Sequence, residues 1–208
     1  MSILRSRTSG GGVVAPDLTA DPTQAFAFTS VTAHYSADLY NGEINLRHPL
    51  FSRLNMLAGF RYLELRDTLS LDGNAGQDNA TTSVTNHLYG FQLGADMVIE
   101  PFSIPIQFKP FMKAGVYGNN VSRLATTTGA DVGNTSIAQS VGQFAFVGEA
   151  GLTTNYEFTK HISAFGGYQV MWIQGVAQAM DSPGAFNPLQ TNQTIFVQGG
   201  EDGLLFQW

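Results

Sequence analysis

The sequence has no cysteine, which excludes disulfide scaffolds, cysteine-based zinc sites and thiol catalysis. Charged residues are also scarce: they make up 12% of the 208 residues, about half the usual share of a soluble globular chain. No apolar run approaches the roughly 18 residues of a transmembrane helix, so an α-helical membrane protein is excluded. The net charge of −6 disfavours nucleic acid as a partner, because few cations could neutralise its phosphates.

Residues 1–24 contain glycine, proline, threonine and aspartate but no apolar core of the kind found in secretory signal peptides. We interpret them as a flexible leader and residues 25–208 as a single domain. Either the chain is not exported, or a signal was removed or lies upstream of Met1. From Phe26 onward, frequent threonine, phenylalanine, tyrosine and valine indicate β-structure.

The clearest structural signal is a period-two alternation of apolar and polar residues, which is typical of β-strands. It runs furthest from Asn86 to Glu100, well beyond the roughly five or six residues of an average strand. Phe91 and Leu93 belong to its apolar face, whereas Gln92 and Asp96 belong to its polar face. We therefore predict a long strand with two chemically different faces.

Similar segments bring the expected total to about eight strands. They are Phe26–Ser36, Gly42–Leu50, Leu54–Tyr62, Ile106–Asn119, Val141–Phe158, Ile162–Val176 and Thr194–Trp208. The alternation changes phase after Tyr62, where Leu63 and Leu65 take the polar positions, and we interpret this change as a β-bulge.

The connections between these segments alternate in length. Leu50–Arg53, Glu100–Ser103 and Thr159–His161 are short, whereas Leu71–Val84, Ala125–Gln139 and Met180–Asn192 are long and polar. Transmembrane β-barrels show this pattern, with short periplasmic turns and longer external loops. The sequence therefore predicts an all-β, antiparallel, up-and-down transmembrane β-barrel with both termini in the periplasm.

The polar faces of the strands hold eight charged residues of balanced sign, which we predict to form a charge network in the lumen. They are Glu43, Arg47, Arg61, Asp96, Lys109, Lys113, Glu149 and Glu157. Mixed charges and frequent glycine suit the narrow inside of a small barrel, whereas the large apolar side chains suit lipid. From the short turns we expect three facing pairs across neighbouring strands. These pairs are Asp96 with Lys109, Gln92 with Lys113, and Glu43 with Arg61.

The chain ends in a segment with Leu204, Phe206 and Trp208 on one face. An apolar, alternating last strand with a terminal aromatic residue resembles the signal that delivers outer-membrane barrels to the insertion machinery. We expect Trp208 to end a strand that pairs with the first strand and closes the barrel, because closure removes both unpaired edges. If Phe26–Ser36 were not a strand, the count would fall to seven, and an odd count would indicate a fragment.

No pattern predicts catalysis, a metal site or a cofactor. His87 and Ser83 could contribute to a hydrolase site at the rim, but no motif supports it, and a polar rim is the simpler interpretation. Asp72–Asp78 is similar to a calcium loop but has Ser83 where an EF-hand has its final glutamate, so we expect a solvated loop.

Four stretches of strand resemble a family of outer-membrane β-barrel proteins that is common in planctomycetes and is also found in proteobacteria. The stretches are Tyr35–Arg47, Leu57–Leu65, Asn86–Gly94 and Val147–Trp172. The resemblance implies a barrel and no catalytic residues. Members of that family carry a signal peptide and more N-terminal sequence, so we expect a fragment, an engineered start or a misassigned start codon.

We therefore expect a monomeric outer-membrane barrel with a structural or surface-exposed role and a lumen filled by side chains. Its partners would be outer-membrane lipid and the barrel-insertion machinery. Three other functions remain open: a small-solute channel if the barrel has more than about eight strands, an outer-membrane lipid-modifying enzyme, or a soluble barrel that carries a ligand.

Overall fold

The computed structural model describes residues 31–73, 78–101, 105–129, 134–159, 161–183 and 188–206, and all of its regular structure there is β-sheet. The predicted leader, residues 1–24, lies outside the described residues. Within the described ranges, no helix is long and apolar enough to cross a membrane.

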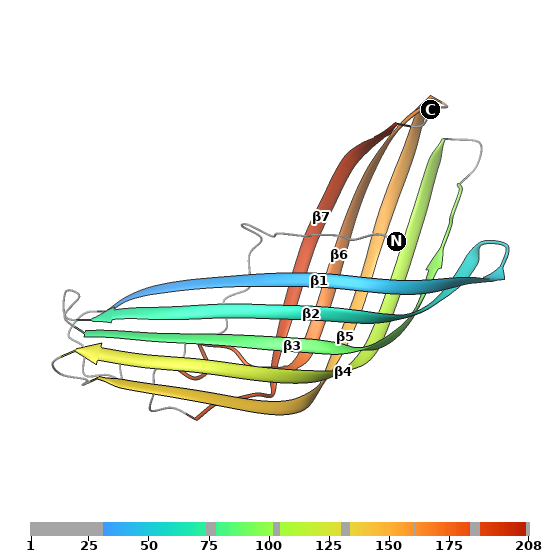
Figure 1. Ribbon diagram of the computed structural model, residues 1–208. Coiled ribbons are helices and arrows are strands. Elements are labelled where there is room, and N and C mark those ends of the chain that lie inside the picture. Colours follow the sequence, from blue (N-terminus) through green and yellow to red (C-terminus); the bar gives the residue numbers. More distant parts are fainter. Residues whose placement is uncertain are drawn as a thin grey trace.

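The described residues form one antiparallel sheet in which each strand pairs with its neighbours in sequence. The strands are β1 (Val31–Phe51), β2 (Leu54–Gly73), β3 (Asp78–Met97), β4 (Ile106–Gly129), β5 (Thr135–Thr159), β6 (Ile162–Val176) and β7 (Gln193–Phe206). The predicted all-β, up-and-down order is therefore confirmed. The sheet curls into a half-barrel, with β1 and β7 at its two edges (Figure 1).

The strand count differs from the prediction of about eight, because the described residues contain seven strands. The segments predicted around Phe26–Ser36 and Gly42–Leu50 are joined in β1, which is continuous from Val31 onward. Asn41–Gly42 resembles a hairpin turn in sequence, but Gly42 pairs regularly with Tyr62. Among the described residues β1 does not pair with β7, so the predicted eight-stranded closed barrel is not observed. Trp208 lies outside the described residues.

Two of the three predicted long loops are mostly strand. β2 and β3 pair up to Gly73 and Asp78, and β4 and β5 pair up to Thr127 and Thr135. Their polar residues are largely threonine and serine; threonine, being β-branched, fits a pleated surface well. The connection after β6 is long, as predicted, but Ser182 within the predicted loop is fully buried rather than external.

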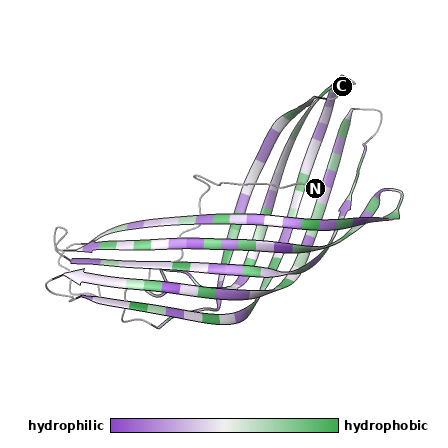
Figure 2. Cartoon of the chain, viewed as in Figure 1, coloured by the Kyte–Doolittle hydropathy of each residue, from purple (hydrophilic) through white to green (hydrophobic). Residues whose placement is uncertain are grey.

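The outer face of the sheet carries an apolar band in the half nearer the short turns. Aligned across the strands are Ile44, Phe60, Phe91, Val116 and Phe146, and next to them Leu46, Ala58, Leu93, Ala114, Gly148, Trp172 and Phe196. Phe91 is 77% exposed whereas the next residue, Gln92, is 3% exposed, which confirms the predicted facing of this strand. Figure 2 shows hydrophobic and hydrophilic residues alternating along the strands.

The apolar band ends at an outward row that contains Tyr62 and Tyr89, and beyond it the two faces exchange character. Leu63 and Leu65 point inward and are buried, while Glu64 and Arg66 point outward. The pairing of β2 is unbroken here, so the predicted β-bulge is wrong. The phase changes because the inner face becomes apolar where the outer face becomes polar.

The interior is packed rather than hollow at its centre. One cluster joins buried side chains from β2 to β7 and includes Leu63, Leu88, Tyr117, Val147 and Ile173. A second cluster lines the part of β2 to β4 beyond the apolar band, where Ala177 and Ala179 pack against the strands. We call this part, in which β1 to β5 extend past the ends of β6 and β7, the extension (Figure 1).

Candidate functional site

Charged side chains cluster on the inner face of the sheet, at the height of the apolar band. There the Arg61 guanidinium pairs with Glu149, and the Lys113 ammonium lies 2.8 Å from Glu43 and 3.6 Å from Glu149. We call Glu43, Arg61, Lys113 and Glu149 the interior charge network. Arg61 is 1% exposed and Glu149 is 7% exposed. Because β1, β2, β4 and β5 each supply a member, the network ties distant strands together across the interior.

Neutral side chains complete the hydrogen bonding of these charges. Arg61 Nε donates to Asn41 Oδ1 at 2.9 Å. Gln92 Nε2 donates to Glu43 at 2.8 Å and to Asn45 at 2.9 Å, and Gln92 Oε1 accepts from the Tyr117 hydroxyl at 3.2 Å. Buried charges that are paired and hydrogen-bonded in this way avoid most of the penalty of lone buried ions.

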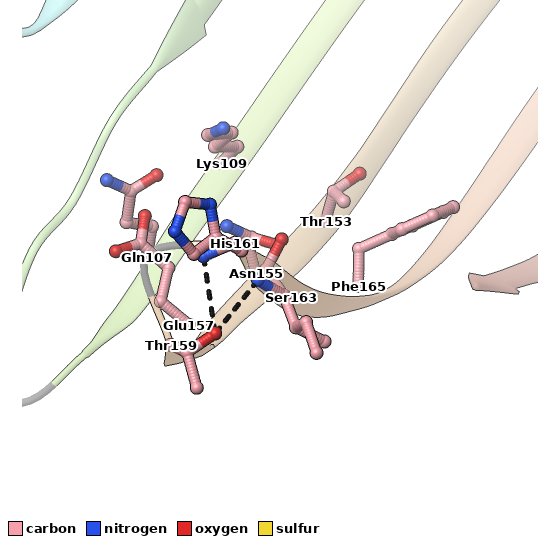
Figure 3. A pocket seen from close by; sticks show the side chains of 10 residues that line it. Gln107, Lys109, Thr153, Asn155, Glu157, Thr159, His161, Ser163 and Phe165 are labelled. Atoms are coloured by element: carbon pink, nitrogen blue, oxygen red, sulfur yellow. Dashed lines mark hydrogen bonds between the residues drawn. The ribbon is translucent and has the colours of Figure 1, made fainter. Parts of the chain in front are cut away.

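The other predicted lumen charges lie nearer the short turns. Arg47 pairs with Asp96, whose carboxylate also accepts a hydrogen bond from Asn55 at 3.2 Å. Lys109 and Glu157 line a concavity of about 430 Å³ with Asn155, His161 and several other polar residues (Figure 3).

The walls of this concavity carry a lysine, a glutamate, a histidine, amides and hydroxyls. The Thr159 hydroxyl accepts hydrogen bonds from the backbone N–H groups of His161 and Ile162, which fixes the short turn between β5 and β6 (Figure 3). The lining of this mouth of the half-barrel therefore includes charged side chains of both signs.

One predicted facing pair is correct and two are wrong. Glu43 lies opposite Arg61 as expected, although each of them forms its ion pair with another residue. Asp96 lies opposite Phe111 rather than Lys109.

Gln92 lies opposite Gly115 rather than Lys113. The centre of the turn lies one residue further along the chain than the prediction assumed, because Ile99 pairs with Phe108. Each residue of β3 therefore lies opposite a β4 residue two positions further along than predicted. The ion-pair partner of Asp96 is instead Arg47, two strands away.

A second set of polar residues, which the sequence did not reveal, holds the start of the β6–β7 connection against the inner face of the extension. We call Ala177–Ser182 the inward segment. Asn86 bonds both the N–H and the carbonyl of Ala177, at 2.9 and 2.8 Å. Asp67 accepts from the Ala179 N–H at 2.9 Å, and Arg123 donates to the Ser182 carbonyl at 2.7 Å.

Asp67 and Arg123 lie on the inner face of the extension, beyond the apolar band. Desolvation, together with the nearby Asp181 carboxyl, raises the pKa of Asp67 to about 7, although hydrogen bonds from Ala179 and Tyr35 act to lower it. Desolvation also raises the pKa of Asp181 and lowers that of Arg123. The sequence contains one indication that Asp67 is unusual, because this aspartate interrupts an inward series of leucines at positions 63, 65, 69 and 71.

The residues considered for catalysis are not brought together. His87 lies 2.9 Å from the Tyr62 hydroxyl and 3.7 Å from Glu64 on the outer face, whereas the Ser83 hydroxyl bonds that of Thr68 at 3.1 Å. Among the described residues, no group of three or more acidic, histidine or cysteine side chains could hold a metal ion. Part of the stretch between Asp72 and Asp78, residues 74–77, lies outside the described residues.

The C-terminal residues are described in part. Leu204 is 59% exposed and faces outward in the row of Ala164, and Phe206 is paired with Ile162 at the end of β7. The structure therefore places Leu204 on the outer face of β7.

The chain matches the family Putative beta barrel porin-7 (BBP7) over residues 17–195 and belongs to it. No curated protein matches the chain.

Proposed function

We propose that this member of the porin-like family is an outer-membrane barrel with a structural, surface-exposed role, and that its interior is filled rather than open. The apolar band supports the membrane location. From Leu54 to Tyr62 it matches the roughly 9 to 11 residues that a tilted strand needs to cross a bilayer. An outward aromatic row at the band edge, which includes Tyr62 and Tyr89, fits a membrane–water interface.

The observation that carries the proposal is the packed centre of the half-barrel. Leu63, Leu88 and Ile173 come from three different strands, touch within one cluster and are fully buried. Below them the interior charge network joins β2 to β5 through Arg61 and Glu149. Strand side chains cannot leave the interior without unfolding, so a barrel closed around this cluster would have a filled centre.

A small-solute channel is the second candidate. β1 and β7 both have one unpaired edge among the described residues, and hydrocarbon does not tolerate open sheet edges. If further strands cover these edges, the barrel widens and a passage can open beside the packed cluster. The name of the family also favours this candidate.

Conductance in planar lipid bilayers separates the two candidates. The full chain, refolded in detergent and inserted, is expected to give no steady current, while an open pore of known conductance serves as the positive control. A reproducible, ohmic single-channel current would contradict the filled interior and establish the channel. Failure to insert would contradict the membrane location itself.

We further propose that the chain is monomeric, contacts outer-membrane lipid and is delivered by the barrel-insertion machinery through Leu204, Phe206 and Trp208. Replacing Leu204 with aspartate should reduce the amount of chain recovered from the outer membrane several-fold, because it puts a charge on the lipid-type face. Gln198→Asp, on the same face of β7, is the matched control, since position 198 is already polar. Equal losses for both variants would show that Leu204 has no special role in delivery.

A further inference from the structure

The inward segment is built into the extension by contacts from many elements. Two residues before it, in β6, Gly175 has a φ of 84°, and its carbonyl accepts hydrogen bonds from Asn119 and Gln143 at 2.9 and 2.7 Å. A Cβ at this position would lie 2.6 Å from the Phe144 carbonyl oxygen, so glycine is required where the chain turns inward. The segment is therefore directed into the interior by the backbone itself.

Asp67 makes the contact at the middle of the segment. Its Oδ2 accepts from the Ala179 N–H at 2.9 Å and faces the Tyr35 hydroxyl at 3.4 Å, while its Oδ1 is buried with no hydrogen-bond partner. Asp67 is 2% exposed. A buried carboxyl oxygen without a donor is costly when it is charged and much less so when it carries a proton.

The ionisable groups around Asp67 do not supply a cation to it. Tyr35 faces it from β1, and Asp181 faces it from the connection. Arg123 on β4 directs one guanidinium nitrogen to the Ser182 carbonyl and another to Gln139. Asp181 also has a buried oxygen with no hydrogen-bond partner. The charged group that acts on the pKa of the Asp67 carboxyl, Asp181, is therefore itself acidic.

We propose that Asp67 is a pH-sensitive latch: its protonated carboxyl holds the inward segment in the extension, and its ionisation loosens the segment. The latch depends on contacts inside the extension and not on whether the barrel conducts. It would make the exposure of the β6–β7 connection, on the side of the barrel opposite the short turns, depend on the surrounding pH.

The sign follows from the two states of the segment. With the segment docked, the pKa of Asp67 is about 7; with the segment released, water reaches the carboxyl and its pKa falls towards about 3.9. A group whose pKa is raised in the docked state stabilises that state most at pH values below the released pKa. The stabilisation is lost as the pH rises from about 4 to about 7, and no further change is expected above that range.

Because the chain has no cysteine, single cysteines can report the docking. Met180→Cys places a thiol in the packed inward segment, and Gln190→Cys places one at an exposed position of the same connection. The ratio of their alkylation rates in detergent-solubilised full chain cancels the common effect of pH on thiols. The Met180→Cys rate relative to the Gln190→Cys rate is expected to rise roughly tenfold or more between about pH 4.5 and 7.5, since each unit of pKa difference contributes a factor of ten.

Further substitutions make the outcome specific. Asp67→Asn keeps an acceptor for the Ala179 N–H but cannot ionise, so most of the rise should be lost and only the contribution of Asp181 should remain. Asp181→Asn should make the rise smaller and end it at a lower pH, because removing a neighbouring negative charge lowers the pKa of Asp67 in the docked state. Asp72→Asn, on the outer face of the same strand, should leave the rise unchanged. The proposal would be overturned if the ratio of alkylation rates did not change with pH in the chain with Asp67 intact, or if the same rise remained with Asp67→Asn. An open-channel current would overturn only the proposed filled interior.

Discussion

At the scale of single residues, the chain concentrates its few charges on the inner face of the sheet. Side-chain type and strand parity were enough to predict that Arg61, Lys113 and Glu149 lie inside. They could not predict that Arg61 meets Glu149, three strands away, because that contact depends on how tightly the sheet curls. Pairing within a hairpin can be predicted from the turn, whereas contacts across the interior need the curvature of the whole sheet.

The Arg61–Glu149 pair should be strongly coupled, because both side chains are almost completely buried. Arg61→Met should reduce the free energy of unfolding by about 3 to 5 kcal/mol, since it leaves Glu149 buried without its main partner. The double variant Arg61→Met with Glu149→Leu should recover part of that loss. Urea unfolding in detergent, followed by tryptophan fluorescence, measures these values.

Arg66→Met is the matched control for this cycle. Arg66 also pairs with a glutamate, Glu64, but its side chain is 57% exposed. An exposed pair contributes only about 0 to 1 kcal/mol. If Arg66→Met destabilised the chain as much as Arg61→Met, or if the losses in the double variant were additive, burial of the network would not be what gives the pair its strength.

At the scale of the strand, each long strand changes its environment along its length. The period-two alternation correctly predicted that Phe91 and Gln92 lie on opposite faces. It did not predict which face is apolar in each half, so the inversion after Tyr62 looked like a bulge. The polar ends of β2 to β5 looked like loops for the same reason, since a polar outer face and a mixed inner face leave few apolar residues in the sequence.

Arginine on the outer face of β3 should reveal the edge of the apolar band. Phe91→Arg should reduce the free energy of unfolding from lipid vesicles by about 2 to 4 kcal/mol if Phe91 lies near the bilayer midplane. Thr85→Arg, on the same face of the same strand but beyond the Tyr89 row, should reduce it by only about 0 to 1 kcal/mol. Equal effects at the two positions would show that the band does not end at Tyr89.

At the scale of the whole molecule, an outer-membrane barrel requires the outer face of the half-barrel to meet lipid and the inner face to be polar near the short turns. The topology followed from the sequence, because consecutive strands joined by short turns pair with each other. The exact count and the edge pairing did not follow, since the first strand runs through a dipeptide that is typical of turns. Both edges need a partner in a membrane.

Spin-label accessibility in lipid vesicles measures whether the outer face of the sheet meets lipid and the inner face meets water. Single cysteines replace Phe91, Leu93 and Leu152 on the outer face, and Arg47, Lys109 and Thr153 on the inner face near the short turns. Molecular oxygen concentrates in hydrocarbon, whereas a water-soluble nickel complex does not enter it. If the outer face meets lipid, oxygen should relax the three outer labels preferentially and nickel should relax the three inner ones. Outer labels relaxed mainly by nickel, or inner labels relaxed mainly by oxygen, would contradict the outer-membrane barrel.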